Sequence, residues 1–397
     1  MRRTAESPPR TSSELLKREL TCWSPDPLCM ERTIPAPPSA CYGNERREGT
    51  MAEKKAAEAD SVLTPAQAMA RAIEVARKGP EHGPNPRVGC VILDPSGRVL
   101  GEGYHRGAGT THAEVAAIAD AAKRGGTTQG ATAYMTLEPC RHVGRTGPCV
   151  DALTEAGITK VVYAVEDPGT ISGGGAGVLK ERGVKVELAP SKDAEELIEH
   201  FLHAHRKERP FVILKFATTL DGRTAAVDGS SIWITSDQAR EHSHHERGRA
   251  DAIIVGTGTI MADDPMLSAR PGGQESGHQP LRVVVGLRDT AGKNVWRDSN
   301  AMQVWSHDPR IVLRELQDRE IRTAIVEGGA TVSSAFLRAG LVDEVQAYVA
   351  PALLGAGRGV VNGLGIHAID DALRLQDVKV TQLGVDTLIT GRPIRKG

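Results

Sequence analysis

Hydrophobic positions in the first half of the chain follow two periods, one typical of strands and one typical of helices. Short apolar runs bounded by turn residues predict strands, and the stretches between them predict helices. Strands that alternate with helices in this way predict a three-layer α/β/α domain. The predicted helices are 64–78, 112–124, 150–156 and 178–182, and the predicted strands are 87–93, 98–104, 131–137, 159–165 and 184–188.

The same kind of pattern starts again after a charged stretch, residues 191–208, which we predict to be one connecting helix. The restart indicates a second α/β domain. Strands are predicted at 211–216, 251–256, 281–286, 323–326 and 342–350, a closing hairpin at 378–383 and 386–390, and helices at 236–248 and 332–339. We therefore divide the chain into an extension (1–60), a first domain (61–190), a connector helix (191–209) and a second domain (210–397).

The extension is rich in proline and scattered charges, with little apolar periodicity, so we expect residues 1–60 to be disordered. Two interpretations of the extension stay open: a targeting peptide, which its many acidic residues disfavour, and a misplaced start codon, with Met51 as the real start of translation. Cys22, Cys29 and Cys41 lie in this extension, and we expect no structural role for them. Cys90, in an apolar run, is expected to be a buried strand residue.

Composition narrows the function classes. The 397 residues carry a net charge of −1, which does not indicate a nucleic-acid or anionic-membrane partner, and only 3% are aromatic, which disfavours base stacking. No apolar run reaches the roughly 18–20 residues of a membrane span, and we find no signal-peptide core. We expect a cytoplasmic protein with a small-molecule substrate.

The stretch from His112 to Cys149 carries the clearest chemistry. His112, Cys140 and Cys149 make a three-ligand zinc set that leaves a fourth position for water. Glu114 follows the histidine by two residues, so it lies near the metal without binding it, as the proton-carrying glutamate does in zinc deaminases. Thr111 is predicted to cap the helix that His112 begins. Both His112 and Cys149 would then lie at helix starts. The positive end of the helix dipole favours the thiolate form of Cys149 over the thiol.

Several further features have two interpretations each. His142 is either a fourth ligand or, as we favour, a substrate-side residue. The cluster of His242, His244 and His245 is more typical of a solvated helix face than of a metal site. Glycine-rich turns at 256–259 and 327–331 follow predicted strands and either bind phosphate or are ordinary packing turns.

These motifs together resemble the bifunctional riboflavin biosynthesis family, which joins a pyrimidine deaminase to a reductase. The likeness covers about residues 65–391 and includes an unusually long gap between the two cysteines. It is carried by Asn85-Pro86-x-Val88-Gly89, His112-Ala113-Glu114, Thr136-Leu137-Glu138-Pro139-Cys140-x-His142-x-Gly144-Arg145-Thr146-x-Pro148-Cys149, Leu214-Lys215, Leu220-Asp221-Gly222-Arg223-Thr224, Trp233-Ile234-Thr235-Ser236, Asp263-Asp264-Pro265 and Glu327-Gly328-Gly329. The chain departs from the family at Arg141, where serine is usual, and in the loop 167–175.

The resemblance implies a cytidine-deaminase-like three-layer α/β/α domain followed by a dihydrofolate-reductase-like α/β domain. It implies zinc in the first domain, with Glu114 catalytic, and NADPH in the second. The residues implied near the cofactor are Ala217, Trp233, Thr259, Asp263, Gly329, Ala330 and Thr331. Those implied to face a substrate are Asn85, Ser231, Arg247, Leu267, Arg270 and Glu327.

Three hypotheses follow. The first is a bifunctional enzyme that deaminates a phosphoribosylated diaminopyrimidine and reduces its ribosyl chain to ribityl. The second is a paralogue that makes another pyrimidine-derived metabolite, and the third is a binding module with one or both sites inactive. The alternative interpretation of Arg247 is a solvated helix residue. The alternative interpretation of Trp233 is ordinary packing. We expect a homo-oligomer, either a dimer or a tetramer.

Overall fold

The computed structural model describes residues 62–142 and 147–394, and all of them fall within one compact unit spanning residues 51–397. The extension of residues 1–60, with its expected disorder and its three cysteines, lies outside the described residues. Among the helices that are described, none is long and apolar enough to cross a membrane.

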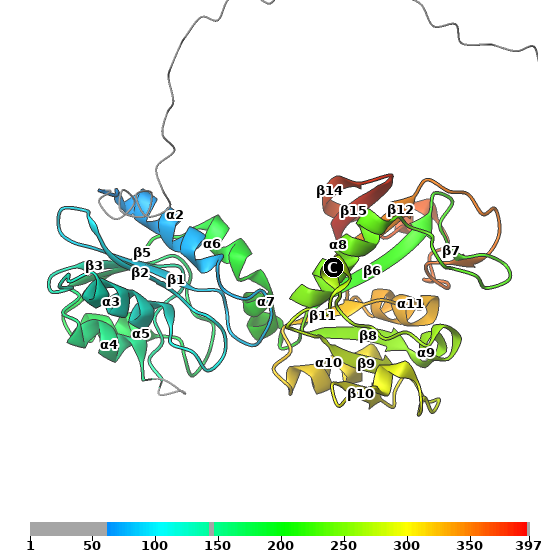
Figure 1. Ribbon diagram of the computed structural model, residues 1–397, viewed down its shortest axis with the longest axis horizontal. Coiled ribbons are helices and arrows are strands. Elements are labelled where there is room, and N and C mark those ends of the chain that lie inside the picture. Colours follow the sequence, from blue (N-terminus) through cyan, green and yellow to red (C-terminus); the bar gives the residue numbers. More distant parts are fainter. Residues whose placement is uncertain (1–61, 143–146, 395–397) are drawn as a thin grey trace, which may run out of the picture. The chain divides into compact units, whose positions relative to one another are not determined.

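A five-stranded sheet organises the first domain (Figure 1). Its order is β2-β1-β3-β4-β5. The strands are β1 (Gly89–Leu93), β2 (Val99–Tyr104), β3 (Thr132–Met135), β4 (Lys160–Tyr163) and β5 (Lys185–Leu188). β1 pairs antiparallel with β2 and β3, whereas β3, β4 and β5 run parallel. The five predicted strands are confirmed, each slightly shorter than expected. Cys90 is fully buried in β1, as predicted.

Helices cover both faces of this sheet, which gives the predicted three layers (Figure 1). They are α2 (Pro65–Ala76), α3 (Ala113–Lys123), α4 (Cys149–Glu155) and α5 (Gly175–Glu181). α2 lies on one face, and α3, α4 and α5 lie on the other. α2 begins at a capping box in which Thr64 and Gln67 satisfy each other's backbone amides. α5 begins three residues before its predicted start.

α3 rests directly on the backbone of β2, because β2 presents glycine beneath it. A Cβ atom at Gly101 would lie 2.4 Å from the Ala117 carbonyl oxygen, and one at Gly103 would lie 2.3 Å from that of Ala113. The helix is alanine-rich on the same face, with Ala113 and Ala117 fully buried. This close approach fixes how high the first residues of α3 stand above the sheet.

The connector is two helices, so the prediction of one continuous helix is wrong. α6 (Lys192–Leu197) and α7 (Glu199–Lys207) are separated by Ile198, whose φ of −119° is outside the helical range. Ile198 is buried in the core of the first domain together with Ala194 and Leu202. Burial of this apolar residue outweighs the helical propensity of the charged residues around it.

The second domain is built on an eight-stranded sheet of order β10-β9-β8-β11-β6-β12-β15-β14. The strands are β6 (Phe211–Thr219), β8 (Ala252–Gly256), β9 (Leu281–Val285), β10 (Ala301–Val304), β11 (Thr323–Val326), β12 (Glu344–Ala350), β14 (Leu375–Leu383) and β15 (Asp386–Pro393). The six strands from β10 to β12 run parallel, and the hairpin β14–β15 continues the sheet antiparallel. β10 and the small pair β7 (Arg223–Ala225) and β13 (Arg358–Gly359) were not predicted.

Alternate residues of the strands face opposite sides of the sheet, and the buried apolar residues described in this domain form four clusters. One core joins the sheet to α10 (Pro309–Gln317) and α11 (Ala330–Arg338) through residues such as Leu316 and Phe336. On another part of the sheet, Ala239 of α8 (Asp237–Arg249) packs against Tyr348 and Leu388. α10 was not predicted, although its apolar face is strongly marked.

Candidate active sites

The three predicted zinc ligands converge. His112 directly precedes α3, Cys149 is the first residue of α4, and Cys140 lies in the loop after β3. His112 Nδ1 lies 3.2 Å from Cys149 Sγ and 3.5 Å from Cys140 Sγ, and the three donor atoms all lie within 4.8 Å of one another. Bonds of about 2.0–2.3 Å to a tetrahedral zinc need separations of this size, so the donor set fits zinc.

The prediction that Thr111 caps α3 is wrong, because His112 itself is the N-cap residue. Its side chain makes no capping hydrogen bond and is turned to the two sulfurs instead. The residue at the start of α3 is therefore a candidate metal ligand and not a side-chain cap of the helix.

The electrostatics of the two thiols also favour a bound cation. Hydrogen bonding from Cys149, and next from His112, lowers the pKa of Cys140 despite its burial. The pKa of Cys149 is raised, first by its hydrogen bond to Cys140 and then by its own burial. The two sulfurs are thus hydrogen-bonded to each other, and a divalent cation, when bound, would supply the charge that favours thiolate at both.

Glu114 lies in the wall of a cavity of about 370 Å³ that also contains His112 and Cys140. Its residue is only 4% exposed, and this burial raises the pKa of its carboxyl. His142 lies in the same wall, but it is not part of the group of metal donors found among the described residues. The favoured interpretation of His142 therefore agrees with its position.

The cavity wall also contains a histidine that sequence reasoning missed. His105 Nδ1 lies 3.1 Å from the Thr111 carbonyl oxygen, so this nitrogen carries the proton. Its Nε2 then accepts from Asn85 Nδ2 at 2.8 Å. This bond leaves the Asn85 side-chain oxygen as the free acceptor in the cavity wall. A lone histidine after a strand gave no signal from which this could be predicted.

Arg141 reaches the altered loop rather than the cavity. Its Nη2 donates to the Thr170 carbonyl oxygen at 3.3 Å, and its backbone amide donates to that of Ser172 at 3.1 Å. Its side chain also approaches Gly174, and Arg141 is not among the residues that line the cavity. The two departures from the family pattern, Arg141 and the loop 167–175, are therefore in contact with each other.

In the second domain the two glycine-rich segments lie side by side at the carboxyl ends of β8 and β11. The Gly256 amide donates to the Gly328 carbonyl at 3.1 Å, and the Gly329 amide donates to Thr259 Oγ1 at 3.0 Å. The prediction of a free turn at 256–259 is wrong in part, because residues from Thr257 form α9 (Thr257–Asp263). α11 likewise begins at Ala330, two residues before its predicted start. Thr259, Gly329, Ala330 and Thr331, predicted to bind the cofactor, are thus brought together.

A buried ion pair lies next to these segments. Arg247 Nε and Nη2 donate to the two oxygens of Glu327 at 2.7 and 2.6 Å, and Lys215 Nζ lies 3.8 Å from the same carboxylate. Burial alone would raise the pKa of Glu327, but the charges of Arg247 and Lys215 outweigh it and bring it to about 2. Burial also lowers the pKa of Lys215, against the effect of Glu327. The interpretation of Arg247 as a solvated helix residue is therefore wrong.

Comparison with known proteins identifies both domains. Residues 64–165 match the family model described as the cytidine and deoxycytidylate deaminase zinc-binding region, and residues 210–389 match the RibD C-terminal domain. The riboflavin biosynthesis protein RibD of Mycobacterium tuberculosis (strain ATCC 25618 / H37Rv) is 48% identical over 313 residues, covering 77% of this chain and 91% of that protein. The chain belongs to the RibD family.

Solved RibD structures resemble the whole described fold. Acinetobacter baumannii RibD is 37% identical with a TM-score of 0.75, covering 83% of this chain and 98% of that one. The deaminase/reductase of Thermotoga maritima is 34% identical with a TM-score of 0.74, covering 82% and 98%. The resemblance and the two-domain fold class predicted from sequence are confirmed. Like its family, this chain is a bifunctional enzyme of riboflavin biosynthesis, with a zinc-dependent deaminase and an NADPH-dependent reductase.

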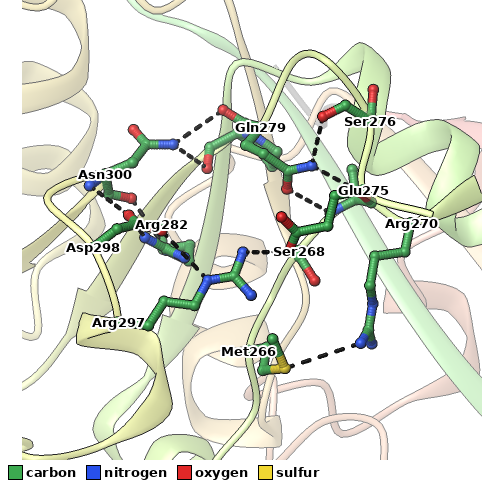
Figure 2. A network of polar contacts seen from close by, with 12 residues as sticks. Met266, Ser268, Arg270, Glu275, Ser276, Gln279, Arg282, Arg297, Asp298 and Asn300 are labelled. Carbon is green, nitrogen blue, oxygen red and sulfur yellow. Dashed lines mark hydrogen bonds and ion pairs between the residues drawn. The ribbon is translucent and has the colours of Figure 1, made fainter. Parts of the chain in front are cut away.

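The loop that carries Leu267 and Arg270 is held by hydrogen bonds from Gln279 and Arg247, and Figure 2 shows its Met266, Ser268 and Arg270 beside Gln279. Gln279 exchanges hydrogen bonds with the Ala269 backbone at 2.9 Å, and Arg247 Nη1 donates to the Ser268 carbonyl at 3.1 Å. The guanidinium of Arg270 extends to Met266, where Nη1 lies 3.9 Å from the sulfur. Arg270 therefore has a fixed backbone and a guanidinium that no described carboxylate neutralises.

The remaining predicted residues take no part in the ion pair of Glu327 or in the hydrogen bond between Thr259 and Gly329. For Ser231, Trp233 and Asp263, no side-chain hydrogen bond occurs within residues 62–142 and 147–394, and Ala217 lies on β6. Trp233 is 71% exposed, with the Arg240 guanidinium 4.1 Å from its ring centre, so ordinary packing does not describe it.

The three histidines of α8 form no metal site with one another in the described structure. His242 Nδ1 lies 2.9 Å from the Tyr348 hydroxyl, and His244 Nδ1 accepts from the Arg270 amide at 3.3 Å. His245 alone is exposed, where it pairs with Glu241 at 3.0 Å. The interpretation of the cluster as a solvated face is therefore correct only for His245.

Proposed function

We propose that His112, Cys140 and Cys149 hold the catalytic zinc of this RibD and that Glu114 carries protons during deamination. The observation that supports this most is the convergence of the three donor atoms beside Glu114 in one cavity. Zinc, when bound, acts as a Lewis acid that lowers the pKa of water. Glu114 then takes a proton from the attacking water and delivers it to the departing amine.

The substrate of this step is 2,5-diamino-6-(5-phosphoribosylamino)pyrimidin-4(3H)-one. Hydrolysis replaces its 2-amino group by a carbonyl oxygen and releases ammonia. Asn85 binds the pyrimidine through its free side-chain oxygen, which can accept from a ring or amino N–H. Its opposite end is already held by His105 at 2.8 Å, so little side-chain freedom is lost on binding.

The reductase then acts on the deaminated product. The ribosyl chain becomes ribityl when C1 of the opened ribose gains a hydride and the heteroatom attached to it gains a proton from solvent; NADPH, when bound, would supply the hydride and leave as NADP⁺. We assign the cofactor to Ala217, Trp233, Thr259, Asp263 and the segment 329–331, supported by the contact between Thr259 and Gly329. Ser231, Arg247, Leu267, Arg270 and Glu327 face the substrate, and the guanidinium of Arg270 is suited to its phosphate.

The proposal includes the organisation of the chain. Residues 61–190 form the deaminase domain, 191–209 the connector, which has two helices rather than one, and 210–397 the reductase domain. We further propose that the protein works in the cytoplasm as a homo-oligomer of two or four chains. Light scattering on the purified full chain measures the mass of the assembly directly.

Zinc analysis and two separate assays test the assignment. Protein purified without chelator should contain stoichiometric zinc, release ammonia from the diaminopyrimidine, and oxidise NADPH only with the deaminated phosphoribosylamino-uracil. Zinc-free protein with full deaminase activity would contradict the metal assignment. NADPH binding without oxidation of that substrate would instead favour another pyrimidine substrate. Rescue of a riboflavin auxotroph that lacks its own enzyme checks both activities together.

A further inference from the structure

The loop that carries Asn85 is contacted by residues of the reductase domain. It connects α2 to β1 through residues 79–86 and has no helix or strand of its own. Asn85 is fixed at its side chain by His105, but its backbone position depends on what holds the preceding residues. Glu81 pairs with Arg87 within the deaminase domain, and the other side-chain contacts come from the reductase domain.

Asp251 is the central contact. It is 6% exposed and directly precedes β8. Its Oδ1 accepts from the Gly83 amide at 2.5 Å, while its Oδ2 accepts from the amides of Arg322 and Thr323 at 3.0 Å each. One buried carboxylate thus joins the deaminase loop to the start of β11. A buried carboxylate requires such donors, so losing one of them is costly.

Arg322 makes a second contact one residue further along. Its Nε donates to the Pro84 carbonyl oxygen at 3.2 Å, so residues 83 and 84 are both held from the reductase domain. Arg322 also lines the deaminase cavity. Asn85 follows immediately in the chain.

Two flanking contacts support the same loop. The His82 ring stacks on that of His278, with ring centres 3.7 Å apart and planes 2° from parallel, and Glu81 pairs with Arg249. His278, Asp251 and Arg322 precede β9, β8 and β11 respectively. The loop is therefore held at the amino ends of parallel strands whose carboxyl ends carry the glycine-rich segments.

We propose that Asp251 and Arg322 are positioning residues for deamination, although they belong to the reductase domain. They hold Gly83 and Pro84, and through them they place the Asn85 amide against the substrate. The inference rests on the proposed role of Asn85 in substrate binding. It implies that the deaminase site is complete only when the reductase domain is folded against it, which gives the fusion of the two enzymes a physical role.

The test measures deamination and reduction separately in the full-length, zinc-loaded enzyme. Asp251→Asn replaces an acceptor oxygen by a donor NH₂ group, and Arg322→Met keeps most of the bulk without a donor. Each should raise the deaminase KM about tenfold, the effect of losing about 1.4 kcal/mol of hydrogen bonding. The deaminase kcat, the zinc content and the reductase kcat/KM should stay within about twofold. Arg314→Met, an exposed arginine on α10, is the matched control and should change nothing.

A double-mutant cycle separates positioning from general damage. Asn85→Ala should raise the deaminase KM, and adding Asp251→Asn to it should raise KM no further, because the partner through which Asp251 acts is gone. An equal rise of KM in both backgrounds, an unchanged KM in both Asp251→Asn and Arg322→Met, or an equal fall of the reductase would overturn the inference. An unchanged KM in Asn85→Ala alone would remove the assignment of Asn85, and the coupling with it. If Asp251→Asn does not fold, the same cycle with Arg322→Met decides.

Discussion

The deaminase site and the reductase site differ in whether cationic side chains of the protein neutralise their buried groups. In the deaminase, His112, Cys140 and Cys149 bring three donors together with no protein cation among them, and Glu114 lies buried beside them. In the reductase, Glu327 is buried too, but Arg247 and Lys215 neutralise it. The three donors of the deaminase site therefore need a bound cation to balance their charge. In the reductase site, the Glu327 carboxylate is already neutralised by Arg247 and Lys215.

This difference explains the opposite pKa shifts of the two glutamates. Burial dominates at Glu114 and raises its pKa, which suits the proton transfer that we propose for it. At Glu327 two cations outweigh burial and lower the pKa to about 2, which suits a permanent charge. A buried glutamate is thus a proton carrier or a fixed anion according to its neighbours.

Replacing Glu114, the proposed proton carrier, should give the largest effect on catalysis. Glu114→Gln keeps the shape but cannot exchange a proton, so the deaminase kcat should fall about 10³-fold, or about 4 kcal/mol. Zinc content and NADPH oxidation should be unchanged. Glu155→Gln, an exposed glutamate on α4, is the control for both assays. A drop of less than tenfold would mean that another group moves the proton.

Removing the fixed anion should act on stability as well as on activity. Glu327→Gln leaves the charges of Arg247 and Lys215 buried without their partner, so unfolding of the reductase domain should become about 3–5 kcal/mol easier. The exposed Glu315→Gln on α10 is the matched control. Denaturant titration followed by a reductase-domain signal measures the difference.

The sign of the pH dependence follows from the same carboxylate. The folded-state pKa of Glu327 is about 2, below the value of about 4.3 expected in the unfolded chain. Its contribution to stability is therefore complete above roughly pH 4.5 and is lost as the pH falls toward 2. The stability gap between wild type and Glu327→Gln should shrink over this window. A gap that stayed constant would show that Glu327 is not ionised in the fold.

Replacing the unusual arginine of the zinc loop should give the smallest effect. Arg141 contacts the 170–174 backbone and does not line the cavity, so Arg141→Ser should leave deaminase kcat and KM within about twofold. Steady-state ammonia release measures both constants. A tenfold rise in KM would instead show that Arg141 contacts the substrate and does not only pack against the loop.

The zinc site could be predicted from sequence because its information is local. His112 and Cys149 lie at helix starts and Cys140 lies in the loop after β3, and the fold places those positions together. α10 could also have been predicted, since Asp308 caps it, Pro309 opens it, and Val312 and Leu316 mark its buried face. α9 was obscured because Gly258 lies in its first turn, where glycine is typical of a loop.

The contacts that complete the sites were beyond sequence patterns. Asn85 and His105 are joined by a hydrogen bond between two different loops, and Gly83 and Asp251 are joined across 168 residues of chain. The break between α6 and α7 depends on burial of Ile198 in a core that only tertiary structure defines. Local periodicity contains no information on such pairs.

The close seat of α3 on β2 has a consequence for mutational tolerance. Any side chain at Gly101 or Gly103 would push the helix away from the sheet and carry His112 and Glu114 with it. A saturation screen scored for deamination should therefore find these two strand positions among the least tolerant in the domain, although neither touches metal or substrate. In an engineering library, the exposed positions of α3 can therefore be varied, whereas Gly101 and Gly103 of β2 should be kept.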